Sequence, residues 1–209
     1  MQILTNSIAV MTLLSLPLCS YAASAPNNEY IAVSAYLGGR ITNDLQDIET
    51  GQNAKISDDF AQALAVNWYF GRNQETELFF SNSKHSLSLT GETESVATDI
   101  YFSYLHFGGK VLFPSEGAIS SSVGLGVGAT FFLPDESKYD KEIALSGNIN
   151  AGLRYELSPR WALRGDIRLY GTVLNSNSSF FCSNEGCLVK VQGEVYVETE
   201  LMAGVEYKF

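Results

Sequence analysis

The chain has 209 residues, of which 45% are hydrophobic and 17% are charged, and its net charge is -10 at neutral pH. This length is enough for one domain or two small ones. The acidic balance argues against nucleic acid as a partner, because nucleic-acid binding requires basic patches. No stretch reaches the roughly 18 consecutive apolar residues of a membrane helix, but transmembrane strands, which alternate in polarity, would escape that criterion.

The N-terminal region has the features of a secretory signal. An apolar run from Ile8 to Leu18 precedes the small residues around Ala22, which suit signal-peptide cleavage. We therefore expect a signal peptide at residues 1–22 and a mature domain at residues 23–209. The region before the apolar run has no Lys or Arg, so a buried N-terminal helix is an alternative. Cys19 suggests lipidation as another, although Leu18 before it is larger than the residue that lipidation usually requires.

Beyond this region, apolar and polar residues alternate in eight segments, at about residues 29–41, 60–70, 75–89, 99–113, 118–133, 142–157, 161–174 and 188–209. Such alternation is typical of a β-strand with one apolar face and one polar face. The last segment is the longest of the eight. One of its faces carries Val195, Val197, Thr199, Leu201, Ala203, Val205, Tyr207 and Phe209, and the other carries four charged residues.

The connectors between these segments alternate in length. Those at 71–74, 114–117 and 158–160 are short and rich in turn residues, whereas those at about 42–59, 90–98, 134–141 and 175–187 are longer and polar. In an up-and-down barrel, this order puts the short turns and both termini at one end. Transmembrane barrels have short periplasmic turns and longer extracellular loops. We therefore expect the cell outer membrane, with long loops extracellular and both termini periplasmic.

The size of the two faces predicts which of them points inward. Eight strands enclose an interior that side chains barely fill. Large residues such as Leu145, Ile149 and Leu169 would overfill it, whereas Ser146, Asn148 and the small residues on the same face would fit. We therefore predict an all-β fold, with an outer-membrane β-barrel at residues 23–209: an eight-stranded antiparallel up-and-down transmembrane β-barrel with a filled polar lumen. His106 and Lys110 are expected to face inward.

Charged side chains on the inward face must pair, because an isolated buried charge is very costly. We expect an ionic network in the lumen, without an open pore, formed by Arg154, Glu156, Arg164, Asp166, Arg168, Glu198 and Glu200.

Aromatic residues gather at the short-turn ends of the predicted strands. Aromatic girdles mark the membrane–water boundary in transmembrane barrels. The predicted girdle consists of Trp68, Phe70, Phe113, Tyr155 and Trp161, together with Tyr207 and Phe209.

Two cysteines lie in the last long connector. Cys182 and Cys187 flank a short polar stretch, and secretion would place them in an oxidising compartment, so we expect a disulfide. A metal site is the alternative, but it would have only two thiols and no nearby His.

At this point the chain resembles the small eight-stranded outer-membrane proteins of Gram-negative bacteria, the OmpA/OmpX-like barrels. The most specific element is the final stretch, LMAGVEYKF, in which alternating apolar residues end in Phe. In that family such an ending is the signal read by the barrel-assembly machinery, so the resemblance implies this role for Tyr207 and Phe209. It also implies outer-membrane lipid and lipopolysaccharide as partners. A soluble peptidoglycan-binding domain is not expected after the barrel.

Three functions follow as hypotheses. The first is a structural or surface-interaction role through the long loops, with an unknown surface ligand. The second is a narrow channel or carrier for small or hydrophobic solutes. The third is a lipid A-modifying enzyme, which the sequence disfavours: such enzymes in this group use a His followed two residues later by a Ser, but Leu87 stands at that position after His85.

No cofactor or metal is expected. The long connectors are acidic, but no spacing of their carboxylates matches a calcium loop.

Overall fold

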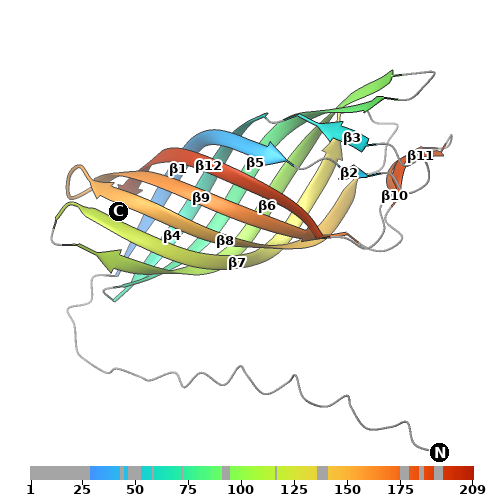
Figure 1. Ribbon diagram of the computed structural model, residues 1–209. Coiled ribbons are helices and arrows are strands. Elements are labelled where there is room, and N and C mark those ends of the chain that lie inside the picture. Colours follow the sequence, from blue (N-terminus) through green and yellow to red (C-terminus); the bar gives the residue numbers. More distant parts are fainter. Residues whose placement is uncertain are drawn as a thin grey trace, which may run out of the picture.

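The computed structural model describes residues 29–42, 45–46, 53–57, 59–71, 73–90, 95–115, 117–135, 141–174, 179–183, 186–190 and 195–209 (Figure 1). The predicted signal peptide lies outside these residues. All regular elements in the described part are β-strands. None of its segments is a helix long and apolar enough to cross a membrane.

Eight long strands form a closed antiparallel barrel. They are β1 (Tyr30–Thr42), β4 (Asp59–Phe70), β5 (Gln74–Thr90), β6 (Ser95–Pro114), β7 (Ile119–Pro134), β8 (Glu142–Glu156), β9 (Trp161–Val173) and β12 (Val195–Lys208). Each pairs with the next along the chain, and β12 pairs with β1 to close the sheet. The predicted fold class is confirmed.

Smaller strands lie at the end of the barrel that carries the long connectors (Figure 1). β2 (Leu45–Gln46) and β3 (Asn53–Ile56) extend the sheet beside β5. β10 (Ser179–Ser183) and β11 (Gly186–Lys190) form a separate hairpin. The opposite end carries the short turns. There Gly71 has a φ of 60°, a conformation that glycine adopts without steric cost, in the turn between β4 and β5.

The start of the last strand was predicted wrongly. The eighth segment was expected to begin near Leu188, but β12 begins at Val195, and Gly186–Lys190 belongs to the β10–β11 hairpin. The alternation of apolar residues keeps its phase through this region, so it does not reveal that one run contains two strands. Pairing of β11 with its immediate neighbour in sequence closes a short loop, which costs little entropy.

The two faces of the barrel wall are oriented as predicted. Along β8, Leu145 is 70% exposed, whereas the adjacent Ser146 is 3% exposed. The same alternation continues through β9, where Leu169 points outward and Arg168 and Tyr170 point inward. The aliphatic residues therefore form the outer wall, and small, polar and charged residues occupy the lumen. A barrel of this polarity suits a lipid surrounding.

The lumen is packed rather than hollow at its centre. Its aromatic and aliphatic part consists of Tyr36, Ala63, Ala65, Phe79, Tyr104, Tyr170 and Met202. Gly128 on the neighbouring strand β7 lies directly opposite His106 in the ladder. A Cβ at Gly128 would collide with the backbone carbonyl of Leu105 and would lie 2.6 Å from Cδ2 of His106, so a glycine there leaves room for the β6 backbone and the His106 ring.

Candidate functional site: the lumen and its two ends

A cluster of buried ion pairs fills the lumen on the short-turn side. Nη1 of Arg164 lies 3.1 Å from Oε1 of Glu75 and 2.9 Å from Oε2 of Glu206. Nζ of Lys110 lies 2.6 Å from Oε2 of Glu77, and Nη2 of Arg168 lies 2.8 Å from Oε1 of the same glutamate. These side chains are nearly inaccessible to solvent.

Asp166 lies between the cations of this cluster. Its carboxylate is 3.8 Å from Nζ of Lys110 and 3.8 Å from Nε of Arg164. Each carboxylate thus faces more than one cation, which offsets the cost of taking the charges out of water.

A second buried pair lies further toward the long connectors. Nη2 of Arg40 is 3.1 Å from Oε1 of Glu200, and it also donates to the hydroxyl of Ser81 at 2.6 Å. Nη1 donates to the carbonyl of Phe102 at 2.9 Å. The guanidinium carbon lies 4.7 Å from the centre of the Tyr104 ring, within range of a cation–π contact. The Arg40 guanidinium therefore has four partners: one carboxylate, one hydroxyl, one backbone carbonyl and one aromatic ring.

The tyrosines of this layer complete the hydrogen bonding of the carboxylates. The rings of Tyr104 and Tyr170 stack with centroids 4.1 Å apart. Tyr170 donates its hydroxyl to Glu200, and Tyr104 donates to Glu198. Tyr196 also donates to Glu198, at 3.1 Å. Among the described residues, Glu198 is a lumen carboxylate with tyrosine partners instead of an ion pair.

His106 connects the tyrosines of this layer to a polar ladder on β8; its ring centroid lies 5.5 Å from that of Tyr104 and 5.6 Å from that of Tyr170. Nδ2 of Asn148 donates to Nδ1 of His106 at 2.8 Å. Nε2 therefore carries the ring proton and donates it to the hydroxyl of Ser146, also at 2.8 Å. Asn150 in turn donates to the side-chain oxygen of Asn148 at 2.9 Å. The ring is neutral in this arrangement and serves to order the polar side chains.

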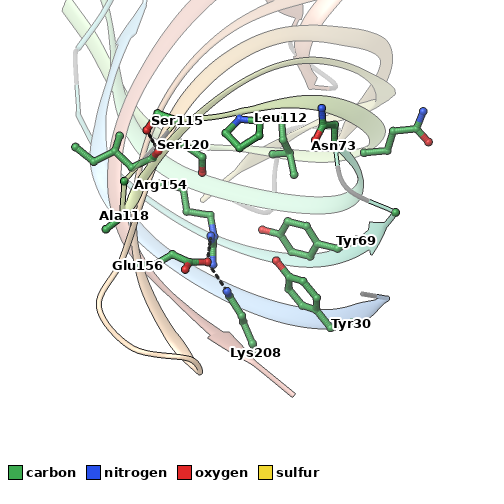
Figure 2. A pocket seen from close by; sticks show the side chains of 15 residues that line it. Tyr30, Tyr69, Asn73, Leu112, Ser115, Ala118, Ser120, Arg154, Glu156 and Lys208 are labelled. Atoms are coloured by element: carbon green, nitrogen blue, oxygen red, sulfur yellow. Dashed lines mark hydrogen bonds and ion pairs between the residues drawn. The ribbon is translucent and has the colours of Figure 1, made fainter. Parts of the chain in front are cut away.

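The short-turn end of the lumen opens into a recess of about 520 Å³ (Figure 2). Glu156 lies at its rim and receives hydrogen bonds from Arg154 and Lys208, both at 2.8 Å. Tyr30 and Tyr69 stack across from them with centroids 4.2 Å apart. Buried groups close the inner end of the recess. Tyr69 donates a hydrogen bond to Glu206 at 2.7 Å, and Arg154 donates to the same carboxylate at 2.8 Å.

The opposite end of the lumen contains a Ser–His pair. Nδ1 of His85 lies 2.7 Å from the carbonyl of Ser57, which can only accept, so Nδ1 carries the proton. Nε2 then accepts from the hydroxyl of Ser83 at 2.5 Å. This is the orientation of a nucleophile and its base. However, Ser83 is 1% exposed and His85 is 0% exposed, so the hydroxyl is enclosed by the wall.

The outer face carries polar groups beyond the apolar band at this end. Nζ of Lys84 lies 2.7 Å from Oδ2 of Asp99, and both side chains are exposed. The hydrogen bond from Lys84 holds the pKa of Asp99 below its usual value. The band of exposed aliphatic and aromatic residues thus ends before this pair.

The structure brings the predicted lumen residues into one interior, but with different partners. The arginines Arg154, Arg164 and Arg168 were expected to pair among the last three strands. Arg154 does pair with Glu156, and Arg164 lies 3.8 Å from Asp166. Arg168, however, reaches Glu77 across the barrel, and Glu200 pairs with Arg40. The network also contains charged groups that were not predicted as its members, although the alternation of their strands already indicated the inward face: Arg40, Glu75, Glu77 and Glu206.

The predicted girdle residues lie at the short-turn ends of their strands. The rings of Trp161 and Tyr207 have centroids 4.8 Å apart, and those of Tyr207 and Phe209 lie 5.0 Å apart. Phe209 is 76% exposed, and its backbone N–H donates to the carbonyl of Ile31 at 3.0 Å. The other outward aromatic residues at this end are Phe70, Phe113 and Tyr155, with Trp68 beside them. A role of this terminus in assembly stays a prediction.

The backbone register of the small hairpin places Cys182 opposite Cys187. The disulfide and the alternative metal site stay predictions.

Comparison with known proteins gives the same architecture. The sequence profile of the outer membrane protein beta-barrel domain matches residues 11–209. The chain belongs to this family. OprG from Pseudomonas aeruginosa superimposes with a TM-score of 0.64 at 14% identity, over 88% of this chain and 97% of that one.

Two further solved outer-membrane barrels are similar. Neisserial surface protein A gives a TM-score of 0.59 at 14% identity, over 87% of this chain and 97% of that one. AlkL gives 0.53 at 19% identity, over 90% of this chain and 94% of that one. A search of the curated proteins found no match. At these identities the similarity concerns the fold. This member of the family is therefore an outer-membrane barrel with a packed, charged lumen.

Proposed function

We propose that this outer-membrane barrel has a structural and surface-interaction role, exerted by its long connectors on the cell exterior, and that it catalyses no reaction. The observation that carries the proposal is the lumen filled with paired charges. A barrel whose interior is occupied by buried Arg, Lys, Glu and Asp side chains offers its ends and its outer wall, rather than a passage, for interaction.

The asymmetry of the two ends supports the long connectors as the interacting part. The short-turn end is built from tight turns, whereas the opposite end is reached by β5 and β6, the two longest strands, with 17 and 20 residues in all. The β2–β3 and β10–β11 pieces lie at that end too (Figure 1). Binding residues are found disproportionately on loops held by a rigid scaffold.

The experiment compares intact cells carrying the full chain with cells carrying a chain shortened in the 136–140 connector. An epitope tag in that connector reports exposure on intact cells. Adherence is measured on surfaces coated with purified lipopolysaccharide and on epithelial monolayers. The proposal expects an accessible tag and adherence that falls when the connectors are shortened. A tag that antibodies reach only after permeabilisation contradicts the outward orientation.

A narrow channel is the second candidate, and the recess of about 520 Å³ at the short-turn end favours it. The recess would serve as one vestibule if the layer of Arg154, Arg164 and Glu206 opened. Planar-bilayer recording distinguishes the two functions. A packed lumen predicts no steady single-channel steps, and ion-selective steps would establish the channel.

The absence of catalysis has its own test. The enclosure of Ser83 and His85 supports a structural role for this pair, because substrate cannot reach a hydroxyl that is 1% exposed. Mass spectrometry of lipid A from cells with and without the protein should show the same acylation. A protein-dependent loss or gain of an acyl chain would identify an enzyme.

A further inference from the structure

The lipid-facing wall contains a groove of about 350 Å³. Its floor is formed by Gly147 on β8 and Gly171 on β9, which lie directly opposite each other in the ladder. Ile149, Leu169 and Val197 form its sides. The outer wall is therefore hollow at a point where two neighbouring side chains are missing.

The groove lies inside the apolar band. Leu145, two residues from Gly147, is 70% exposed, and Ile149 on the other side is 60% exposed. Water would find few hydrogen-bond partners in a groove with apolar walls at this depth. If the groove were empty, the residues that line it would lose dispersion contacts. A flexible hydrocarbon chain is the occupant that this surrounding supplies.

The position of the groove along the barrel axis indicates in which leaflet of the membrane it lies. Gly147 lies eight residues from Tyr155, which marks the aromatic girdle at the short-turn end. At about 3.3 Å per residue and a tilt of about 40°, this is about 20 Å along the barrel axis, within an apolar band about 25 Å tall. The groove thus lies in the half of the membrane on the side of the long connectors.

A cation precedes β8 on the side of the headgroup region. Lys141 is exposed immediately before β8 and has the same parity as Ile143, Leu145 and Gly147. A positive charge above a hydrocarbon-lined groove is complementary to an anionic lipid. We propose that the Gly147–Gly171 groove seats one acyl chain of a lipopolysaccharide molecule, with Lys141 near its phosphates. This inference rests on the proposed orientation, in which the long connectors face the cell exterior.

A second copy of the barrel fits the groove less well. Stable protein interfaces bury about 1,200–2,000 Å². The groove is only a few residues wide, and the surface on either side curves away around the barrel.

The test fills the groove. Neither glycine has a positive φ, and an added Cβ would lie 3.4 Å from Cγ1 of Val195 at Gly171 and 3.3 Å from the carbonyl oxygen of Gly126 at Gly147. Gly171→Leu therefore occupies the cavity with little change in the backbone, and Gly147→Leu is the second variant. The matched control is Gly39→Leu, since Gly39 is outward-facing and a Cβ there has no neighbour within 4 Å.

Native mass spectrometry of the full chain, extracted from membranes containing lipopolysaccharide and phospholipid, counts the retained lipid. The unaltered protein and Gly39→Leu should each retain one lipopolysaccharide, and Gly171→Leu and Gly147→Leu should retain about tenfold less, equivalent to about 1.4 kcal/mol. Lys141→Gln should weaken the preference for lipopolysaccharide over phospholipid.

The proposal would be overturned if the unaltered protein retained no lipopolysaccharide, or retained phospholipid in its place. It would also be overturned if the filled variants retained as much lipopolysaccharide as the unaltered protein, or if the protein formed a dimer that Gly171→Leu dissociates. The accessibility of the connector tag on intact cells distinguishes a failure of the groove proposal from a failure of the proposed function. With the tag accessible, equal lipid retention refutes the groove alone, whereas an inaccessible tag refutes the orientation on which both depend.

Discussion

Arg40 provides the sharpest test of the buried charge network. Its guanidinium contacts Glu200 at 3.1 Å, Ser81 at 2.6 Å and the carbonyl of Phe102 at 2.9 Å, and the side chain is 1% exposed. Arg40→Met keeps most of the volume of the side chain but leaves Glu200 without its ion-pair partner.

The expected cost follows from these contacts. Removing one member of a buried ion pair costs about 3–5 kcal/mol, and the lost contact with the Tyr104 ring adds about 1 kcal/mol. We therefore expect Arg40→Met to lower the free energy of unfolding by about 4–6 kcal/mol. The double variant Arg40→Met/Glu200→Gln should lose less than the sum of the two single variants, by about 1–3 kcal/mol.

Reversible unfolding by urea or guanidinium in lipid vesicles measures these values. The two tryptophans, Trp68 and Trp161, report the transition, and the heat-dependent gel mobility of the folded barrel gives a second readout. Arg160→Met is the matched control, because Arg160 is exposed in a short turn and its loss should change stability by about 0.5 kcal/mol or less. A cost below about 1 kcal/mol for Arg40→Met, equal to that of the control, would refute the buried network.

The remaining predictions concern the wall, the terminus and the hairpin. Leu201→Arg, at the middle of β12, should cost about 2–4 kcal/mol of stability in vesicles, whereas Val195→Arg at the strand end should cost about 0–1 kcal/mol; equal costs would argue against a lipid-facing wall. Deletion of Phe209 should reduce the amount of assembled, heat-modifiable barrel without reducing export, and normal assembly would contradict its role as a signal. Cys182 and Cys187 should resist alkylation until a reductant is added, as intact-mass measurement can show, and immediate labelling of both thiols would exclude the disulfide.

The sequence predicted the face of most side chains because the barrel wall imposes a strict two-residue period. Leu169 and Arg168 illustrate this: a difference of one position moves a side chain from the outer wall to the lumen. The volume of an eight-stranded interior then decides which face is which. Neither inference requires knowledge of the strand partners.

The pairing inside the lumen was not predictable in the same way. Arg40 and Glu200 are 160 positions apart and lie directly opposite each other only because β1 and β12 close the barrel in one register. Arg168 reaches Glu77 across the lumen, and that contact depends on barrel tilt and closure together. The β10–β11 hairpin, residues 179–190, was missed because a local alternation pattern contains no information about which strand pairs with which.

The central claim is that aliphatic side chains face lipid while the lumen is closed by small, polar and charged groups. Methyl-detected NMR in nanodiscs carrying a nitroxide on the acyl chains tests it in one experiment. The methyl signals of Ile149, Leu153 and Leu201 should broaden more strongly than those of the inward-facing Ala63, Ala65 and Ala162. Stronger broadening of the alanines than of the three aliphatic residues would contradict the account.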